Sequence, residues 1–515
     1  EALQLIKREN PFPAVCGRIC NRRCEDACTR GTVDQAVAID EVKRFIAQQD
    51  LNAAARFVPE KVIPKVDGEF SEKIAVIGGG PAGLSCAYYL AEKGYRPTVF
   101  EKEARPGGML MNGIPSFRLE KDVVEAEIAV LRELGVEFRC GVEVGRDVTI
   151  PQLREQGYRG FYVAVGLQSG GRLGAEGDDA EGVTAGIDFM REVNLHDNKT
   201  LTGRVVVIGG GNIAADVART AVRCGAESVD LYCLEGYDEM PMGAEDRGEC
   251  ERDGITIHAG WGVVSVGKEG EKCASVTFKK CLAVKNAEGR FAPRFDENII
   301  SSANADHVLY CIGQKVDWRD LLTGTAVEFN ANGTAKADPV TYQTAEADIF
   351  VGGDAYSGQK FAIDAIAAGK EGAVSLHRFV QGATLTVGRN RRQFIELNKE
   401  TALIPVNYDN TPRQRIGYNE ALRKTFRDER VAFTEEQVKR ETARCLGCGA
   451  SVVDPNKCIG CGVCTTKCAF DAIRLHRERP ECSKMYACED KMKAILPYMI
   501  QREIRIKRAA RKNKK

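Results

Sequence analysis

Eight cysteines gather near the end of the chain, six of them in the stretch "CLGCGASVVDPNKCIGCGVCTTKC": Cys445, Cys448, Cys458, Cys461, Cys464, Cys468, Cys482 and Cys488. The four from Cys458 to Cys468 have the spacing C-x2-C-x2-C-x3-C, in which three thiolates hold one [4Fe-4S] cluster and the fourth ligates another. Eight thiolates are the number that two clusters require. We therefore predict a ferredoxin-like domain with two clusters here.

The spacing divides these cysteines between the two predicted clusters. One cluster takes Cys458, Cys461 and Cys464, and the other takes Cys445, Cys448 and Cys468, with Cys482 and Cys488 in the two fourth positions in unknown order. Two alternatives are a zinc ribbon formed by Cys445, Cys448, Cys458 and Cys461, and a single cluster with spare thiols. The further cysteines at the next ferredoxin positions argue against zinc.

Four more cysteines lie near the start of the chain, each four residues after the last: Cys16, Cys20, Cys24 and Cys28. On a helix this spacing places all four thiols along one face, within reach of a second iron–sulfur site. The alternative is four small buried side chains. The remaining cysteines are scattered in apolar company and are interpreted as core thiols.

The first glycine-rich stretch, "EKIAVIGGGPAGLSCAYYLAEKGYRPTVFEKE", predicts a buried strand, a turn, an amphipathic helix and a second strand. Gly78, Gly80 and Gly83 have the dinucleotide-binding spacing, and Pro81 and Ala82 open the helix whose amides face the phosphates. Glu101, followed by Lys102, ends the second strand eighteen residues beyond Gly83, where a carboxylate accepts ribose hydroxyls.

The same pattern returns in "GRVVVIGGGNIAADVARTAVRCGAESVDLYCLE", so the chain should bind two dinucleotides. Gly209 and Gly211 are followed by Asn212, Ile213 and Ala214, whose alanine still permits close helix packing. Glu235 lies twenty-one residues beyond Ala214, where a carboxylate binds a free 2′-hydroxyl and repels a 2′-phosphate. This position favours NADH over NADPH, unless Glu235 is merely a solvated strand end.

Composition excludes several classes of protein. Lys plus Arg and Asp plus Glu number 73 each, so no overall charge recruits nucleic acid or an anionic membrane. No stretch approaches the ~18 apolar residues that a membrane span needs, and no signal peptide opens the chain, so we expect a cytoplasmic protein. Its 20 cysteines are then not expected to form disulfides, and the clustered ones indicate metal sites. The chain begins inside an apparent helix, "EALQLIKREN", so we expect further sequence upstream.

From about residue 10 to 385 the chain resembles the small subunit of glutamate synthase, the N-terminal half of dihydropyrimidine dehydrogenase and the large subunit of NADH-dependent ferredoxin:NADP oxidoreductase. The resemblance rests on "VCGRIC", "AVIGGGPAGLSCAYYL", "GGMLMNGIPSFRL", "VVVIGGGNIAADVART" and "GGDAYSGQKFAIDAIAAGKEGA". It implies FAD at the first loop and a nicotinamide at the second. The further cofactor-binding residues that it implies are Gly108, Met109, Ile114, Arg118, Gly166, Gly313, Gly353, Asp354 and Ala362.

The resemblance implies an α/β fold with two Rossmann-like domains between two iron–sulfur domains. The expected parts are a helical iron–sulfur domain (1–70), an FAD-binding domain in two pieces (71–200 and 326–385), an NAD(P)H-binding domain (201–325), a connecting arm (386–440), the ferredoxin-like domain (441–490) and a basic C-terminal helix or tail (491–515). The tail is either simply solvated or docks on an acidic partner.

Residues matched to the relatives refine two of these sites. Cys20, Cys24 and Cys28 match cluster ligands, Cys16 matches a non-ligand, and Lys43 stands where relatives have glutamine or glutamate. An ammonium cannot donate a lone pair to iron, so we expect one or two N-terminal [4Fe-4S] clusters. Relatives that use NADPH commonly have two arginines where this chain has Cys233 and Leu234, which again favours NADH.

No side chains suggest acid–base or nucleophilic catalysis. The stretch "PGGMLMNGIPSFRLEKDVV" has no redox cysteine pair, and the five histidines are isolated in the sequence: His196, His258, His307, His377 and His476. The cofactors therefore carry the chemistry.

We predict an NADH-linked FAD and iron–sulfur oxidoreductase subunit that exchanges electrons with ferredoxin or a catalytic partner subunit. Electron bifurcation is a hypothesis that depends on flavin potentials, which no motif reports. Alternatives are an NADPH-dependent glutamate synthase small subunit, which feeds a glutamine amidotransferase partner, and a non-catalytic redox sensor.

Overall fold

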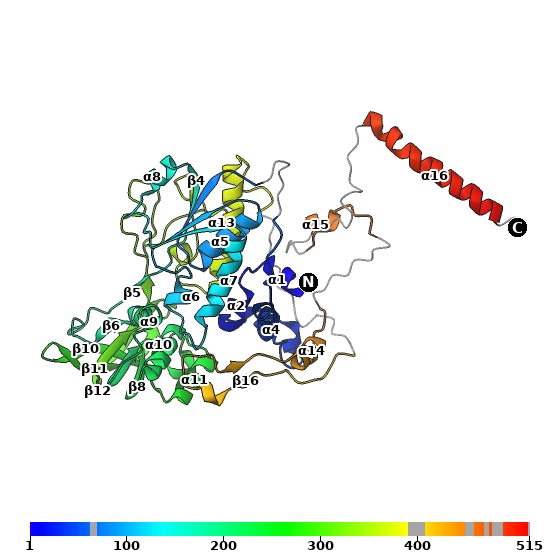
Figure 1. The fold of residues 1–515 in the computed structure, drawn as a ribbon. Helices are drawn as coiled ribbons and strands as arrows, with labels where there is room; N and C mark the ends of the chain where they lie inside the picture. Colours follow the sequence, from blue (N-terminus) through cyan, green and yellow to red (C-terminus); the bar gives the residue numbers. More distant parts are fainter. Residues whose placement is uncertain (62–68, 390–406, 449–457, 468–472, 476–487, 513–515) are drawn as a thin grey trace. The chain divides into compact units, whose positions relative to one another are not determined.

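The computed structural model of the 515-residue chain describes all residues except 62–68, 390–406, 449–457, 468–472, 476–487 and 513–515 (Figure 1). The chain divides into two compact units. The larger comprises Glu1–Arg389 and Asn398–Cys448, and the smaller comprises Asn390–Leu397 and Gly449–Lys515. Both glycine loops and the N-terminal cysteines therefore belong to the larger unit.

The chain opens with short helices: α1 (Ala2–Lys7), α2 (Pro13–Ile19), α3 (Arg23–Asp26), the 3-10 helix η1 (Thr29–Thr32) and α4 (Ile39–Leu51). Helices α2 and α4 cross closely at Gly17, where a Cβ would lie 2.8 Å from the Cα of Arg44. The Ala14 amide donates to Glu127 of the following domain at 2.9 Å. The helical segment is thus packed onto the first nucleotide-binding domain.

The first nucleotide-binding domain contains a parallel five-stranded sheet in the order β15-β4-β1-β2-β3. Its strands are β1 (Lys73–Ile77), β2 (Thr98–Glu101), β3 (Glu137–Cys140), β4 (Tyr158–Val163) and β15 (Ile349–Val351). Its helices are α5 (Pro81–Glu92), α6 (Met109–Asn112), α7 (Lys121–Glu133), α8 (Ile150–Glu155), α12 (Asp354–Ser357) and α13 (Ala362–Val380). Strands β1, β2, β4 and β15 are largely buried, as is typical of a parallel sheet covered by helices on both faces, whereas the edge strand β3 is partly exposed.

The second domain repeats this architecture, with a parallel sheet in the order β6-β13-β7-β8-β9. Its strands are β6 (Val183–Ala185), β7 (Arg204–Ile208), β8 (Ser228–Cys233), β9 (Thr256–Ala259) and β13 (His307–Tyr310). Its helices are α9 (Gly186–Leu195), α10 (Asn212–Arg223), the 3-10 helix η2 (Tyr237–Glu239) and α11 (Ala244–Asp253). An antiparallel sheet of β10 (Trp261–Glu269), β11 (Lys272–Lys285) and β12 (Phe291–Asn304) follows, and β5 (Ser169–Gly170) pairs with β14 (Gln314–Lys315).

The boundary between the two domains lies earlier than the predicted change at residues 200 and 201. Strand β6 pairs with β13 in the second sheet, so residues from 183 onward belong to the second domain. A three-residue strand shows no periodic pattern and could not be recognised from sequence. Leu321 and Leu322 pack into the core of the first sheet, so its second piece begins before the predicted residue 326.

The segment predicted as a connecting arm is part of the larger unit where it is described. From residue 407 it forms β16 (Gly417–Tyr418), the 3-10 helix η4 (Glu420–Leu422), β17 (Arg430–Val431) and α14 (Glu435–Ala443). Arg430 donates to the carbonyls of Arg18, at 3.0 Å, and Arg118, at 2.8 Å. Hydrogen bonds of this kind, which no hydrophobic pattern reveals, fix the segment to the helical domain and to the first nucleotide-binding domain.

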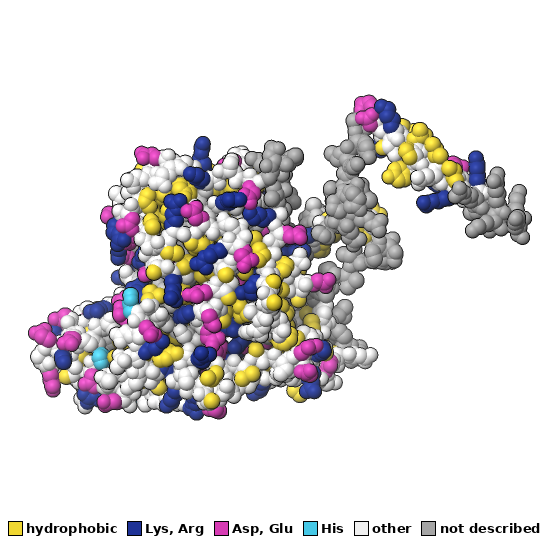
Figure 2. All heavy atoms as spheres, viewed as in Figure 1, with side chains coloured by type: hydrophobic (Ala, Val, Ile, Leu, Met, Phe, Trp, Pro, Cys, Tyr) yellow, Lys and Arg dark blue, Asp and Glu magenta, His cyan; other side chains and the backbone are white. Residues whose placement is uncertain are grey.

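The smaller unit contains α15 (Val463–Lys467), the 3-10 helix η6 (Cys488–Asp490) and α16 (Lys491–Lys512). Helix α16 exposes apolar side chains that include Met492, Leu496 and Tyr498, visible as a yellow stripe in Figure 2. It lies within residues 491–515, for which the sequence predicts a basic helix or tail. In the part of the chain that the structure describes, no helix is long and apolar enough to cross a bilayer.

Candidate cofactor sites

The first glycine loop connects β1 to α5 and lies tightly against the sheet. Gly78 has φ +104° and donates to the Phe100 carbonyl at 2.8 Å, and a Cβ on it would lie 2.5 Å from the Ala164 oxygen. A Cβ on Gly83 would lie 2.0 Å from the Gly78 oxygen. Only glycine fits at both positions, so the loop leaves room for a pyrophosphate at the N-terminus of α5.

Glu101 ends β2 beside this loop, where the spacing predicted it. Its carboxylate accepts from the amides of Gly79, at 2.7 Å, and Glu103, at 2.9 Å. Burial raises the pKa of the Glu101 carboxyl, whereas the two backbone donors favour the charged form. The carboxylate is thus held at the edge of the loop, where a dinucleotide ribose would lie.

A cavity of about 980 Å³ extends from this loop, large enough for stacked cofactor rings. Gly108, at φ +51°, lies against the first glycine loop, because a Cβ on it would be 2.8 Å from the Cα of Gly80. A side chain at Gly108 would therefore clash with that loop. Burial raises the pKa of Asp354 in the cavity wall to about 6. Predicted residues of the first site that line the cavity are Gly78, Gly80, Pro81, Ala82, Glu101, Lys102, Gly108, Met109, Ile114, Arg118, Gly166, Gly353, Asp354 and Ala362.

Arg118 also connects the two nucleotide-binding domains. Its Nε lies 2.7 Å from Asp216 and its Nη2 lies 2.6 Å from Asp246, and both carboxylates belong to the second domain. Burial raises the pKa of Asp216 to about 6, while Arg118 favours its charged form. The predicted contact between Arg118 and a cofactor remains a prediction, and the ion pairs give this residue a structural role as well.

Lys121 supports the cavity wall and was not predicted. Its ammonium donates to the Leu110 carbonyl at 2.9 Å and also to the Ile114 carbonyl. Burial lowers the pKa of Lys121 to about 7. The sequence shows only a lysine at the start of a helix, so no motif could have indicated this contact.

The second glycine loop connects β7 to α10 in the same way. Gly209, at φ +145°, donates to the Tyr232 carbonyl at 2.9 Å, and a Cβ on it would lie 2.5 Å from the Cys311 oxygen. Nothing lies within 4 Å of a Cβ on Gly211, so the N-terminus of α10 faces open space. Asn212 and Ile213 line the cavity that the first loop also lines.

Glu235 follows β8 and reaches the second loop. Its Oε2 lies 2.7 Å from where a Cβ on Gly210 would be, much as Glu101 Oε2 lies 2.9 Å from the equivalent point on Gly79. The predicted residues of the second site that are not among those lining the cavity are Gly209, Gly211, Ala214, Glu235 and Gly313. Gly83 of the first site is also outside its lining, because it packs the helix against the strand.

The N-terminal cysteines do not lie on one helix, in contrast to the expectation from their spacing. Helix α2 ends at Ile19 because Cys20 is extended, and Arg22, at φ +58°, interrupts the chain before α3. Cys24 lies in α3 and Cys28 caps η1. Burial raises the pKa of the Cys16 thiol to about 12.

Cys20 of the N-terminal segment lines the same cavity as the first glycine loop. It is the one cysteine among the described residues that line this cavity. Lys43 forms an ion pair with Asp40 at 2.5 Å and bears a charge close to Cys16 and Cys24.

The C-terminal cysteines are described only in part. Cys445, Cys448, Cys458, Cys461 and Cys464 are exposed. Cys468 and Cys482 lie outside the described residues, and Cys488 is described only as part of η6. Among the described residues, no three Cys, His, Asp or Glu side chains converge on one point. The donor set is nevertheless all thiol, the ligand type that iron–sulfur clusters require.

The model of the pyridine nucleotide-disulphide oxidoreductases matches residues 72–369, which contain both glycine loops. The chain belongs to the pyridine nucleotide-disulphide oxidoreductase family. Two further family models match the ends of this oxidoreductase. The model of dihydropyrimidine dehydrogenase domain II with its 4Fe-4S cluster matches residues 1–55, and the model of the 4Fe-4S binding domain matches residues 451–474. Iron–sulfur domains at both ends, as predicted, are thereby confirmed.

Curated relatives of this oxidoreductase confirm the resemblance to subunits of larger enzymes. The NADP(+)-dependent formate dehydrogenase subunit beta of Moorella thermoacetica is 34% identical over 87% of this chain and 67% of the relative. The NAD-dependent dihydropyrimidine dehydrogenase subunit PreT of Escherichia coli O157:H7 is 33% identical over 74% of this chain and 85% of the relative. The glutamate synthase [NADPH] small chain of Halomonas elongata is 33% identical over 72% and 80%.

Solved structures of other oxidoreductases confirm the α/β fold. Mycobacterium tuberculosis FprA in complex with NADPH superimposes with a TM-score of 0.52 at 17% identity, over 61% of this chain and 85% of FprA. The chain is thus an NAD(P)H-dependent FAD and iron–sulfur oxidoreductase with the predicted order of cofactor domains.

Proposed function

We propose that this chain oxidises NADH at a bound FAD and passes the electrons singly, through its iron–sulfur clusters, to a partner protein. The choice of NADH rests on one observation, the position of Glu235 beside the second glycine loop. Its carboxylate oxygen lies 2.7 Å from the Cβ position of Gly210. A carboxylate there accepts a hydrogen bond from a free ribose 2′-hydroxyl and repels a 2′-phosphate.

Glu235 is needed to choose between NADH and NADPH, because the relatives do not agree on the nicotinamide. Among the similar subunits, one is named for NADP, one for NAD and one for NADPH, so family membership alone does not select the nicotinamide. Cys233, two residues before Glu235, is buried and uncharged. It therefore cannot supply the cationic contact that a 2′-phosphate requires.

The arrangement of the larger unit supports hydride exchange followed by single-electron transfer. FAD, when bound, accepts a hydride and releases electrons one at a time. The chain's residues place both nucleotide loops on one cavity, where Gly80 of the first and Asn212 of the second are wall residues. Cys20 lines the same cavity, so a cluster on the N-terminal cysteines would lie next to the flavin site.

The experiment is reduction of the anaerobically purified holoprotein by each nicotinamide in a stopped-flow spectrometer. We expect NADH to bleach the flavin at least about tenfold faster than NADPH at equal subsaturating concentration, since one lost favourable contact of about 1.4 kcal/mol corresponds to that ratio. Equal rates, or faster reduction by NADPH, would contradict the proposal and favour the glutamate synthase alternative.

The partner is tested on the same preparation. After reduction by NADH, ferredoxin and a co-purified subunit are offered as acceptors, and we expect reoxidation of the flavin together with reduction of the acceptor. Ammonia-dependent or glutamine-dependent glutamate formation with an amidotransferase subunit would instead identify a glutamate synthase small subunit.

A further inference from the structure

Cys445 and Cys448 lie apart from the other C-terminal cysteines in the organisation of the chain. The larger unit ends at Cys448, and the matched 4Fe-4S binding domain begins at residue 451. Both observations separate this C-x2-C pair from the spacing that starts at Cys458. These two observations indicate that Cys445 and Cys448 bind a different cluster from the one that they share with Cys468 in the sequence prediction.

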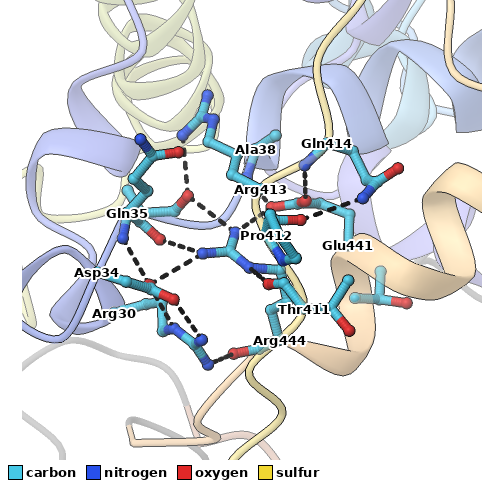
Figure 3. A network of polar contacts seen from close by, with 12 residues as sticks. Arg30, Asp34, Gln35, Ala38, Thr411, Pro412, Arg413, Gln414, Glu441 and Arg444 are labelled. Carbon is cyan, nitrogen blue, oxygen red and sulfur yellow. Dashed lines mark hydrogen bonds and ion pairs between the residues drawn. The ribbon is translucent and has the colours of Figure 1, made fainter.

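Arg444, the residue before Cys445, is buried. Figure 3 shows its polar contacts, which include Asp34 and Gln35 of the helical N-terminal domain. Its Nη2 donates to the Gln35 carbonyl at 2.6 Å and lies 3.0 Å from Asp34. Its Nη1 lies 2.6 Å from Glu441, which also accepts from the Ala38 amide at 2.8 Å. A buried guanidinium with this many acceptors fixes the adjoining backbone firmly.

Arg30 makes the reciprocal contact from the N-terminal side. Its Nη1 donates to the Arg444 carbonyl at 2.9 Å, and its Nη2 lies 2.6 Å from Asp34. Arg30 is two residues after Cys28, and the Arg444 carbonyl is bonded directly to the nitrogen of Cys445. Neighbouring Cα atoms are about 3.8 Å apart. Cys28, two residues from Arg30, and Cys445, next to Arg444, therefore both lie close in the chain to the hydrogen bond between Arg30 and the Arg444 carbonyl.

We infer that Cys445 and Cys448 are ligands of an N-terminal [4Fe-4S] cluster that they share with Cys28. Thiolates are the ligands that such a cube requires, and each thiol loses its proton as iron binds. Cys445 and Cys448 are exposed, so their thiols can turn towards Cys28 without displacing packed side chains. The cluster is then built from the two ends of a chain segment more than 400 residues long.

The assignment changes the count in the smaller unit. Six of the eight C-terminal cysteines remain beyond residue 457, which supplies one complete cube with two thiols to spare but not two cubes. The inference rests on the iron–sulfur domains and is independent of which nicotinamide the chain uses.

The test measures iron and acid-labile sulfide in the full chain, purified and reconstituted anaerobically, with flavin content as the control for folding. The variants are Cys28→Ser, the double variant Cys445→Ser/Cys448→Ser, Cys461→Ser, and the combinations of the double variant with each single one. We expect the double variant to lose about four irons per chain, the content of one cube.

The combinations decide between the two assignments. Adding Cys28→Ser to the double variant should cause no further loss of iron, because both changes remove the same cluster. Adding Cys461→Ser should remove about four more irons. The loss on adding Cys461→Ser is expected under both assignments and serves as the control. Additive loss of iron on adding Cys28→Ser would overturn the inference, because Cys28 and the pair Cys445 and Cys448 would then belong to different clusters. Low-temperature electron paramagnetic resonance should show that the double variant and Cys28→Ser lose the same signal.

A measurement on the unaltered sequence guards against variants that fail to fold. Iron is removed from the full chain by a chelator, and neighbouring thiols are joined with dibromobimane before peptide mass spectrometry. A cross-link between Cys28 and either Cys445 or Cys448 is expected. Cross-links of that pair only to Cys458 or Cys461 would overturn the inference.

Discussion

Replacing Glu235 with glutamine is expected to remove most of the preference for NADH. The amide keeps the shape and one acceptor oxygen of the carboxylate, but it carries no charge. It should still bind a ribose 2′-hydroxyl, more weakly, and it should no longer repel a 2′-phosphate.

The magnitude follows from the geometry. If the phosphate lies about 5 Å from the carboxylate, each pair of unit charges costs about 3 kcal/mol at an effective dielectric constant near 20. Exposure to solvent and salt reduces this, so we take about 2 kcal/mol as the gain for NADPH. A hydrogen bond to a charged group contributes about 1.5–3 kcal/mol and one to a neutral group about 1, so NADH should lose about 1 kcal/mol. Together these shifts change the kcat/KM ratio by about 100-fold.

The assay is steady-state reduction of an artificial acceptor by each nicotinamide, with kcat/KM compared between the wild type and Glu235→Gln. The matched control is Asp238→Asn, which removes a neighbouring charge in η2 and should leave the ratio within about twofold of the wild type, because a separated surface charge is screened. An unchanged ratio in Glu235→Gln, or the same change in Asp238→Asn, would refute the reasoning.

Three further predictions concern the cavity and the domain interface. Gly78→Ala should abolish FAD retention, because its Cβ would meet a carbonyl oxygen at 2.5 Å, whereas Gly141→Ala, also at positive φ but in open space, should retain flavin in the absorbance spectrum. Arg118→Met should lower the free energy of unfolding by about 3–5 kcal/mol in denaturant titrations, because buried carboxylates lose their partner, while Arg105→Met at an exposed pair should cost at most about 1. Asp354→Asn should flatten the pH dependence of stability between about 4 and 6 in the flavin-free chain. The raised pKa of Asp354 means that its contribution is fully present below pH 3.8 and is lost as the pH rises through about 6, so an unchanged melting profile would contradict this assignment.

Much of the fold and both nucleotide loops could be predicted because their physical requirements are local. A glycine such as Gly78 is needed where the backbone itself is crowded, and Glu101 follows at a spacing fixed by one helix and one strand. Such patterns lie within some thirty residues. Gly78 and Glu101 line one cavity, whereas Gly209, Gly211 and Glu235 of the second loop lie outside its lining.

The features that could not be predicted depend on contacts between distant residues. Arg430 links carbonyls more than 300 residues away, and Lys121 supports the cavity through backbone oxygens that carry no sequence signal. The break in the N-terminal helix arises at Cys20, which is extended, and at Arg22, which adopts a left-handed conformation that its side chain does not indicate. Strand β6 is too short to show a pattern, so the sequence predicts the domain boundary too late in the chain.

The hydrogen bond between Arg30 and the Arg444 carbonyl also bears on biosynthesis. The two residues are separated by 414 positions, so at about 5–20 residues per second a ribosome needs about 20–80 seconds to make the second after the first. During that interval the guanidinium of Arg30, which is buried in the finished protein, lacks this acceptor. The N-terminal segment therefore completes this contact only after residue 444, close to the end of the chain, has been synthesised.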